Sequence, residues 1–381
     1  MKCSYIVAAT VLMSSGLVAC GLSSDESDQD LSVTQSKLST CGFGGFDYMR
    51  ALKLNADSSL DIVSPQADHI HQYMATGAPQ DSFTYSQQSV ANLWGAANYT
   101  WTADYDGDGR EDLASANGGN IYMKLATAAG TFSSATWPVI NQWGDPRVTH
   151  AGRFTADNRG DIATAIGGTI NLFVSGGTGF TLKQSSIPNN WGDLNWVRVA
   201  DFTGDGILDF ASPSGGNVFI KAGGGDGTFV GSTWMVTNAW GSSDWTLVGD
   251  FDGNGRADLA SANGGNVYMK LSTGSSFTSV TWQVANQWGF SWHPAADFTG
   301  DGRTDILSYQ NGSNFVYMKV STGTGFSSQT WSLDAVSPIG DVVFVGDFTG
   351  DGKADLATFY ESICVVKIYE STGTGFISHT S

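Results

Sequence analysis

The sequence lacks several features that would indicate common classes of protein. It has 18 Lys and Arg against 36 Asp and Glu, a formal net charge of −18, and therefore lacks the basic surface expected of a nucleic-acid-binding protein. No segment shows the apolar periodicity of an amphipathic helix. Beyond the first 20 residues, no apolar run is long enough to cross a membrane. Outside the acidic loops described below, we find no Ser/His/Asp arrangement, phosphate-binding loop or pair of catalytic carboxylates, so we expect a binding protein and not an enzyme.

What the chain does contain is one acidic motif, repeated seven times at intervals of 47 to 51 residues. Each repeat also holds runs of strand-forming residues between Gly-rich turns, enough for four short strands. A fixed period of this size with four strands per repeat predicts an all-β fold, a seven-bladed β-propeller of four-stranded blades. The intact motifs are Asp104–Asp112, Asp201–Asp209, Asp250–Asp258, Asp297–Asp305 and Asp347–Asp355, and the two degenerate ones are Lys53–Asp61 and Arg153–Asp161.

The intact motifs predict calcium sites. Oxygen-bearing side chains stand at positions 1, 3, 5 and 9, and Gly at positions 4 and 6 allows the sharp turn that brings them together. Such a set suits a hard cation with six to eight oxygen ligands, and calcium fits it better than magnesium. We predict about five structural calcium ions. The predicted ligands are Asp104, Asp106, Asp108 and Asp112; Asp201, Thr203, Asp205 and Asp209; Asp250, Asp252, Asn254 and Asp258; Asp297, Thr299, Asp301 and Asp305; Asp347, Thr349, Asp351 and Asp355.

A simpler interpretation of the motif is an Asp-Gly turn between two strands, because Asp and Gly are common in turns. In the degenerate motifs, Lys53 and Arg153 replace the first Asp. A cationic side chain could neutralise the remaining carboxylates there, so we expect no metal in the first and third blades. Positions 1, 3, 5 and 9 of the motifs hold 20 of the 36 acidic residues, so the negative net charge needs no basic partner to explain it.

The first 20 residues predict a secretory signal. Lys2 precedes the apolar stretch Ile6–Met13, and Leu17-Val-Ala-Cys20 resembles the lipobox of bacterial lipoproteins, in which the Cys is lipidated. The alternatives are an ordinary signal peptide cleaved elsewhere, or a membrane anchor. The predicted organisation is a lipoprotein signal at 1–19, a flexible tether at 20–30 and the propeller at 31–381. The expected location is the bacterial cell envelope, lipid-anchored at the outer membrane or cell surface, or outside the cell.

The two ends of the propeller predict how its ring closes. The last repeat stops before its Thr-Trp strand, and the segment Leu31–Gly44 is unmatched at the start. We therefore expect the N-terminal segment to supply the fourth strand of the last blade, which would remove an exposed sheet edge. Cys41 and Cys364 would then both belong to that blade. A disulfide between them would stabilise the closure, and the alternative is two free thiols.

The acidic motifs resemble the FG-GAP and VCBS repeats of integrin-type propellers over residues 31–381. The order of Trp-containing strand, acidic loop, Gly-Gly-Val-Tyr strand and Gly-x-Phe turn further resembles PVL-type lectins. That resemblance implies pockets between blades for N-acetylglucosamine-type sugars. The departures are a TGTGF turn and the recurring Asn-x-Trp-Gly.

Aromatic residues at the blade junctions are the candidate ligand contacts. A second set of aromatic residues follows the Trp-Gly tryptophans by a few positions, namely Tyr99, Trp196, Trp245 and Trp292. Four amides in the Gly-Gly-Asn turns could bind sugar hydroxyls, namely Asn117, Asn120, Asn263 and Asn266. The alternative is packing between blades, which we expect for Trp137, Trp234, Trp282 and Trp331. Lys124, Lys221, Lys270 and Lys319 are expected in solvated strand positions. The candidate ligand-binding residues are Trp94, Trp143, Trp191, Trp240 and Trp288.

The predicted function is multivalent glycan binding or adhesion by a calcium-binding propeller. Glycans or glycoconjugates are the expected partners, with surface proteins as a further class. The alternatives are a polysaccharide-cleaving, lyase-like enzyme and a protein-binding scaffold. Only the first blade, with Asp68-His-Ile-His71, departs enough from the others to suggest catalysis or a protein partner.

Overall fold

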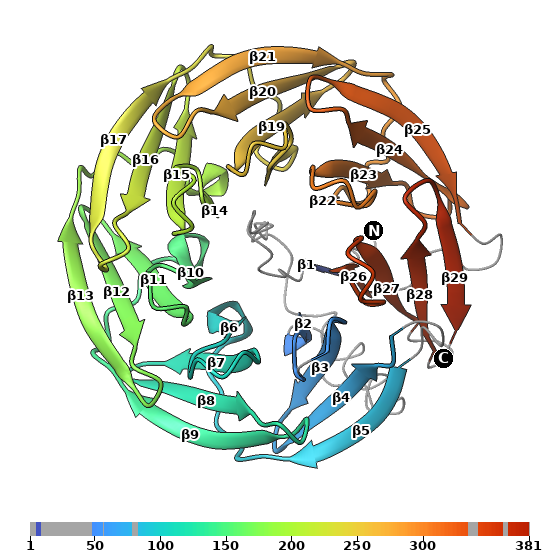
Figure 1. Ribbon diagram of the computed structural model, residues 1–381. Coiled ribbons are helices and arrows are strands. Elements are labelled where there is room, and N and C mark those ends of the chain that lie inside the picture. Colours follow the sequence, from blue (N-terminus) through green and yellow to red (C-terminus); the bar gives the residue numbers. More distant parts are fainter. Residues whose placement is uncertain are drawn as a thin grey trace, which may run out of the picture.

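Seven blades, each with four antiparallel strands, form a closed ring (Figure 1), and the sheet of the seventh blade has one additional strand. The computed structural model describes residues 5–8, 48–55, 57–77, 83–333, 342–360 and 365–380. Each blade's first strand lies nearest the centre of the ring and its fourth strand at the rim, which confirms the predicted seven-bladed β-propeller.

Blades 1 to 4 follow one another along the chain, and each uses four consecutive strands. Blade 1 consists of β2 (Arg50–Leu52), β3 (Asp61–Gln66), β4 (His69–Ala75) and β5 (Phe83–Ser89). Blade 2 consists of β6 (Thr100–Ala103), β7 (Asp112–Asn117), β8 (Asn120–Ala126) and β9 (Phe132–Pro138). Blade 3 consists of β10 (Thr149–Gly152), β11 (Asp161–Ile166), β12 (Thr169–Ser175) and β13 (Phe180–Ser186). Blade 4 consists of β14 (Arg198–Ala200), β15 (Asp209–Ser214), β16 (Asn217–Gly223) and β17 (Phe229–Met235).

Blades 5 to 7 continue the same order. Blade 5 consists of β18 (Thr246–Gly249), β19 (Asp258–Asn263), β20 (Asn266–Ser272) and β21 (Phe277–Gln283). Blade 6 consists of β22 (Ala295–Ala296), β23 (Asp305–Tyr309), β24 (Phe315–Ser321) and β25 (Phe326–Ser332). Blade 7 consists of β26 (Val342–Gly346), β27 (Asp355–Tyr360), β28 (Val365–Ser371) and β29 (Phe376–Thr380).

Apolar cores between neighbouring blades hold the ring together. The core between blades 4 and 5 contains Phe202, Ile220, Val248 and Leu259, all fully buried. Fourth-strand tryptophans contribute edge-on contacts to the Phe that begins the next blade's fourth strand, with ring centroids 4.9 to 5.3 Å apart. This confirms the predicted packing of Trp137, Trp234, Trp282 and Trp331, which are 3 to 7% exposed.

A ring of seven backbone hydrogen bonds also links the blades. In every acidic motif the N–H at position 8 donates to the position-1 carbonyl of the preceding blade, at 2.7 to 3.0 Å. The bond between blades 7 and 1 repeats those at the other six junctions. The donor and acceptor pairs are Leu60 to Asp347, Glu111 to Lys53, Gly160 to Asp104, Leu208 to Arg153, Ala257 to Asp201, Thr304 to Asp250 and Ala354 to Asp297.

The closure of blade 7 differs from the prediction. Its fourth strand is β29, from the C-terminal end of the chain, and not a strand from residues 31–44, which lie outside the described residues. The N-terminal part does join this sheet, but through β1 (Tyr5–Ala8), which pairs in parallel with the innermost strand β26. The prediction that both ends of the chain meet in one blade is therefore correct. The predicted arrangement is wrong, because β29 is the fourth strand and the N-terminal strand pairs at the inner edge of the sheet. Cys20, Cys41 and Cys364 also lie outside the described residues.

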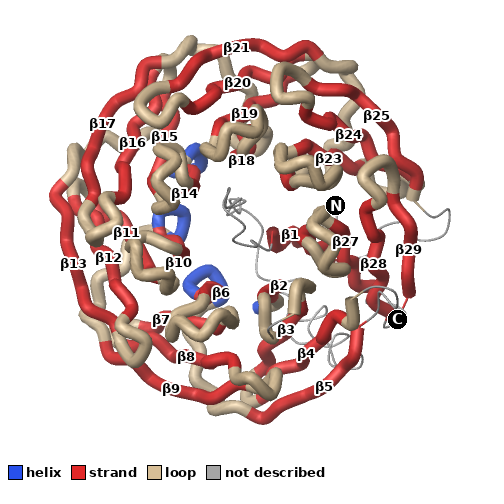
Figure 2. The backbone as a smooth tube through the Cα atoms, in the orientation of Figure 1, coloured by secondary structure: helices blue, strands red, loops and turns tan. Residues whose placement is uncertain are grey.

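Short helical turns occur where one blade leads into the next. They are the 3-10 helices η2 (Ala97–Tyr99), η3 (Pro146–Val148) and η4 (Leu194–Trp196), and they lie beside the innermost strands (Figure 2). In η3 and η4, the preceding Asp side chain accepts a hydrogen bond from the backbone N–H two residues later. The turns η2 and η4 end on Tyr99 and Trp196, whose rings contact Trp143 and Trp240 of the following Trp-Gly segments. Among the described residues, no helix is long and apolar enough to span a membrane.

Candidate functional sites on two faces of the ring

The strand order places the two kinds of candidate site on opposite faces of the ring. Because neighbouring strands in a blade run antiparallel, the loop after the first strand and the turn after the third strand lie at one end of the sheet. The turn after the second strand and the segment that links one blade to the next lie at the other end. We call these the loop face, which carries the acidic motifs, and the junction face, which carries the Trp-Gly segments.

Position 1 of each intact loop organises its own backbone. In blade 5, Asp250 Oδ1 accepts hydrogen bonds from the N–H groups of Gly253 and Asn254, and its Oδ2 accepts one from Gly255, at 2.7 to 3.0 Å. Gly253 and Gly255 have φ of +77° and +82°, in the left-handed region that favours glycine. The same pattern recurs around Asp104, Asp201, Asp297 and Asp347.

The Asp at position 9 ties the loop to the third strand. Asp258 is fully buried, and its two oxygens accept the backbone N–H groups of Phe251 (3.1 Å) and Ser272 (2.6 Å). Burial raises the pKa of Asp258 to about 8. The equivalent Asp in every other blade is also fully buried and accepts the equivalent N–H from the third strand, which explains why position 9 survives even in the degenerate motifs.

Two loops gather three carboxylates each. In blade 5, oxygens of Asp250, Asp252 and Asp258 lie within 4.8 Å of one another, and in blade 2 the same holds for Asp104, Asp106 and Asp108. Carboxylate oxygens in this number fit a hard divalent cation such as calcium. Since Asp258 accepts only one N–H on each oxygen, a lone pair on each remains for a cation.

Blades 4, 6 and 7 carry Thr at position 3. The hydroxyls of Thr203 and Thr299 lie 3.3 Å from the position-1 carboxylates of their own loops. Thr349 is 5% exposed, and its hydroxyl has no hydrogen-bond partner among the described residues. Because a buried hydroxyl without a partner is costly, this oxygen also fits a cation ligand.

The degenerate loop of blade 3 is held by protein contacts. The Thr155 hydroxyl lies 3.0 Å from Asp157 Oδ1 and 2.8 Å from Asp161 Oδ2, and the N–H of Ala156 donates to the carbonyl of Gly225 in blade 4. The predicted neutralisation by Arg153 is not seen among the described residues. Arg159 pairs with Asp157 instead, at 3.1 Å.

In blade 1, the side chains of Asn55 and Asp57 accept hydrogen bonds from the backbone of the degenerate loop. The side chain of Asn55 accepts the N–H of Asp57, and the side chain of Asp57 accepts the N–H of Ser59. The backbone N–H of Lys53 donates to Glu111 Oε2 of blade 2. As in blade 3, the predicted cation shows no ion pair with the loop's carboxylates among the described residues.

On the junction face, the recurring Trp-Gly is a connection between blades. Trp288 Nε1–H donates to the carbonyl of Gly264 at 2.7 Å, and Trp94, Trp143, Trp191 and Trp240 make the equivalent bond to the preceding blade at 2.8 to 3.0 Å. The following glycine is needed because the backbones approach closely. A Cβ at Gly241 would lie 2.1 Å from the carbonyl oxygen of Ala262.

The recurring lysines are buried, so the prediction of solvated positions is wrong. Lys124, Lys221, Lys270 and Lys319 are at most 1% exposed, and each Nζ lies 4.3 to 5.0 Å from the ring centre of a junction Trp. Each also donates to an oxygen of the segment before that Trp, at 2.6 to 3.1 Å. Burial lowers the pKa of each ammonium to about 8. The expectation failed because neighbouring blades cover both faces of a propeller blade.

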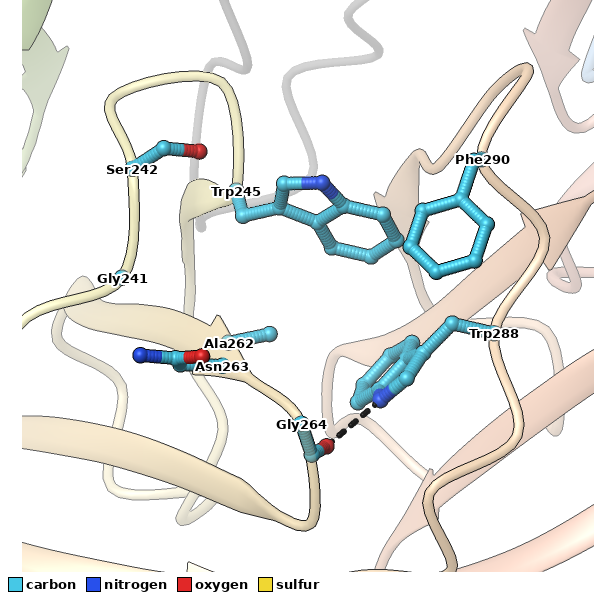
Figure 3. Close-up of a pocket in the computed structure, with 8 residues that line it drawn as sticks. All are labelled: Gly241, Ser242, Trp245, Ala262, Asn263, Gly264, Trp288 and Phe290. Atoms are coloured by element: carbon cyan, nitrogen blue, oxygen red, sulfur yellow. Dashed lines mark hydrogen bonds between the residues drawn. The ribbon is translucent and has the colours of Figure 1, made fainter.

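A pocket of about 390 Å³ opens on the junction face at blade 5 (Figure 3). Trp245, Trp288 and Phe290 form its aromatic wall, and the turn at Asn263 with Ser242 forms the opposite side. The rings of Trp245 and Trp288 meet edge-on with centroids 5.2 Å apart. Phe290 is 74% exposed. The volume lies in the range of small-ligand sites.

Trp245 is held from behind by blade 6. The His293 ring stacks on it at 3.8 Å with an interplanar angle of 4°, and His293 Nε2–H donates to the carbonyl of Asp244. Sequence reasoning missed His293 and Phe290. The signal for Phe290 is its position directly after Trp-Gly, where the other blades have Ala, Asp or Ser. Trp292, expected near the junctions, is instead 2% exposed in the core between blades 6 and 7.

Asn266, His69 and His71 contact other residues of the protein. Asn266, expected to contact ligand, accepts a hydrogen bond from Gln283. In blade 1, His69 contacts Asp68 at 2.7 Å. His71 is 4% exposed and lies between the Tyr85 hydroxyl (2.9 Å) and the Gln66 side chain (3.2 Å).

Comparisons with known proteins agree with this architecture. Residues 250–308 and 297–358 match the family model described as FG-GAP-like repeat. No curated protein matches the sequence. A solved lectin from Agrocybe aegerita, which recognises non-reducing terminal N-acetylglucosamine, is 21% identical, with a TM-score of 0.66 over 84% of this chain and 89% of that chain. The Tc holotoxin pore of Photorhabdus luminescens is 15% identical, with a TM-score of 0.49 over 86% of this chain and 15% of that chain.

The chain is therefore a seven-bladed β-propeller. Its segment from the loop of blade 5 to the second strand of blade 7 contains FG-GAP-like repeats.

Proposed function

We propose that this protein binds glycans through pockets on its junction face. The pocket at blade 5 carries the proposal, because it sets an aromatic wall against an amide and a hydroxyl side chain. Sugars present apolar C–H faces and polar hydroxyl edges, and this lining matches both. Its eight residues include no ionisable side chain, so the pocket offers stacking and hydrogen bonding without acid–base chemistry. The Agrocybe aegerita lectin, with the same fold, binds a sugar.

We also propose that the acidic loops of blades 2, 4, 5, 6 and 7 bind structural calcium ions. The support is the convergence of oxygen donors described above and the unpartnered hydroxyl of Thr349. A bound ion would join the loop to the buried Asp at position 9, and through it to the third strand. Repeated pockets on one rigid ring would bind multivalent glycans with avidity greater than that of a single site.

The proposed location follows from the lipobox-like segment at Cys20. Lipidation there would attach the propeller to the cell envelope through residues 21–30. The ring would then be presented to glycans or glycoconjugates outside the cell.

A glycan-array screen of the calcium-loaded protein tests the central proposal. We expect binding to a subset of glycans, with those ending in N-acetylglucosamine as the first class to examine. Trp245→Ala and Phe290→Ala should weaken binding. Met235→Ala, which changes another exposed apolar residue at the end of a fourth strand, should not. Absence of binding to every glycan by a correctly folded protein would refute the proposal.

A further inference from the structure

The described junctions are not equivalent. In blade 2, Trp101 contacts Trp143, with ring centroids 6.0 Å apart. In each of blades 1 to 5, one further residue at the start of the blade stands at the position of Trp245, whose ring faces Trp288. That residue is aromatic in blades 1, 2, 4 and 5, and it is Val148 in blade 3. The aromatic pairs, with their centroid separations, are Tyr48 with Trp94 (6.3 Å), Tyr99 with Trp143 (6.4 Å), Trp196 with Trp240 (5.8 Å) and Trp245 with Trp288 (5.2 Å).

The four aromatic pairs are of two kinds. In blades 1 and 2 the tyrosine hydroxyls of Tyr48 and Tyr99 donate to the carbonyls of Gly95 and Gly144, both at 2.7 Å. Each of these hydroxyl protons is therefore already engaged in a hydrogen bond within the protein and is not available to a ligand. In blades 4 and 5 the facing residue is Trp, which offers a larger ring surface. Among the described residues, no hydrogen bond involves the indole N–H of Trp196 or Trp245, so these groups can donate to a ligand.

The junction of blade 3 lacks the facing aromatic residue and the Asn that line the blade 5 pocket. Val148 is 3% exposed and packs into the core between blades 3 and 4, so it forms no wall. Ile166 stands where blade 5 has Asn263 and is 43% exposed. A sugar at this junction would meet no aromatic ring at position 148 and no amide at position 166.

We propose that the junctions of blades 4 and 5 are the principal glycan sites, that those of blades 1 and 2 bind more weakly, and that the junction of blade 3 does not bind. This inference rests on the proposed glycan-binding function. It assigns Trp196 and Trp245 as the residues that determine which junctions are occupied, and it limits the valency among blades 1 to 5 to four.

Indole N–H signals in two-dimensional NMR report on each junction separately. The full-length protein, labelled with ¹⁵N, is titrated with N,N′-diacetylchitobiose, which has a non-reducing terminal N-acetylglucosamine. Single Trp→Phe variants assign the signals. We expect progressive shifts for Trp196, Trp240, Trp245 and Trp288 at the lowest sugar concentrations. Trp143 and Trp94 should shift only at higher concentrations, and Trp191 should not shift.

A gain-of-function variant makes the test independent of loss of folding. Val148→Trp combined with Ile166→Asn should make the Trp191 signal respond to the sugar. The matched control, Val148→Ile with Ile166→Val, should leave Trp191 unresponsive. Where the first variant fails to fold, Ile166→Asn with Val148→Tyr replaces it.

The outcomes separate this inference from the proposed function. If Trp191 shifts with the same concentration dependence as Trp245 in the unmodified protein, the ranking is overturned while glycan binding stands. If no indole signal shifts, and the glycan array is also negative for the folded protein, both fail.

Discussion

Asp258 and Asn263 stand at opposite ends of the single strand β19, one in the loop of blade 5 and the other at its pocket. Five residue steps of extended chain separate them by about 17 Å. A cation held by Asp258 therefore cannot reach a ligand that contacts Asn263. Any influence of the metal on binding has to pass through the stability of the blade.

Removing metal should consequently leave local binding intact while the fold persists. We expect the affinity of the blade 5 pocket for its glycan to change less than about twofold in EDTA, at temperatures where circular dichroism shows a native protein. Titration with and without calcium, following the Trp245 indole signal, checks this. A complete loss of affinity by a folded, metal-free protein would show direct participation of the ion.

Calcium should raise the melting temperature. Each site saturated at 100 times its Kd contributes about 2.7 kcal/mol. Asp250→Asn with Asp252→Asn should abolish one such contribution, because it removes two of the three clustered carboxylates in blade 5. The matched control is Asp157→Asn in the degenerate loop of blade 3. Scanning calorimetry with and without calcium measures both, and an equal loss in the control would contradict the assignment of sites.

Lys270 should make stability depend on alkaline pH. Its pKa is lowered to about 8 in the folded protein, against about 10.4 in an unfolded chain. Between these values the unfolded state holds more protons, so raising the pH from 8 to 10.5 stabilises the fold, by at most about 3 kcal/mol. The contact with Trp240 and the bond to Ala239 favour the charged form and reduce this value.

Comparing the protein with Lys270→Met isolates this effect. Denaturant melts of both proteins at pH 8 and pH 10 should show the difference in stability moving in favour of the Lys form as the pH rises. A pH-independent difference would mean that burial does not lower the pKa of Lys270. Lys183, which lies on a fourth strand, supplies a control through Lys183→Met.

Cys20→Ser should release the protein from the cell envelope. If the predicted lipid modification occurs, incorporation of radiolabelled palmitate and recovery in the membrane fraction both depend on this thiol. Cys3→Ser is the matched control, since the predicted processing removes Cys3. Unchanged labelling of Cys20→Ser would refute the lipoprotein assignment.

Most of the fold could be predicted because every repeat carries the same sequence signals for its loop and strands. The period of the acidic motif indicated the number of blades, and the fourth-strand Trp residues were correctly assigned to packing. Glycines at positions 4 and 6 correctly indicated a sharp loop. Each of these features depends on residues within one repeat, and the intact repeats share them.

Features that depend on the neighbouring blade were not predictable. Lys270 looks solvated in its own strand, and only the approach of the segment at Ala239 and Trp240 buries it. Phe290 and His293 belong to the link into blade 6, yet they complete a pocket and support a ring at blade 5. The hydrogen bonds between successive loops join residues some 50 positions apart, and no pattern within one repeat encodes them.

The bond from Leu60 to Asp347 links blades 7 and 1 with the same backbone hydrogen bond that links the other six pairs of neighbouring blades. This contact between blades is therefore the same whether or not the chain is continuous between them. Circular permutants whose new ends fall in another link, such as the one between blades 3 and 4, should assemble the same ring.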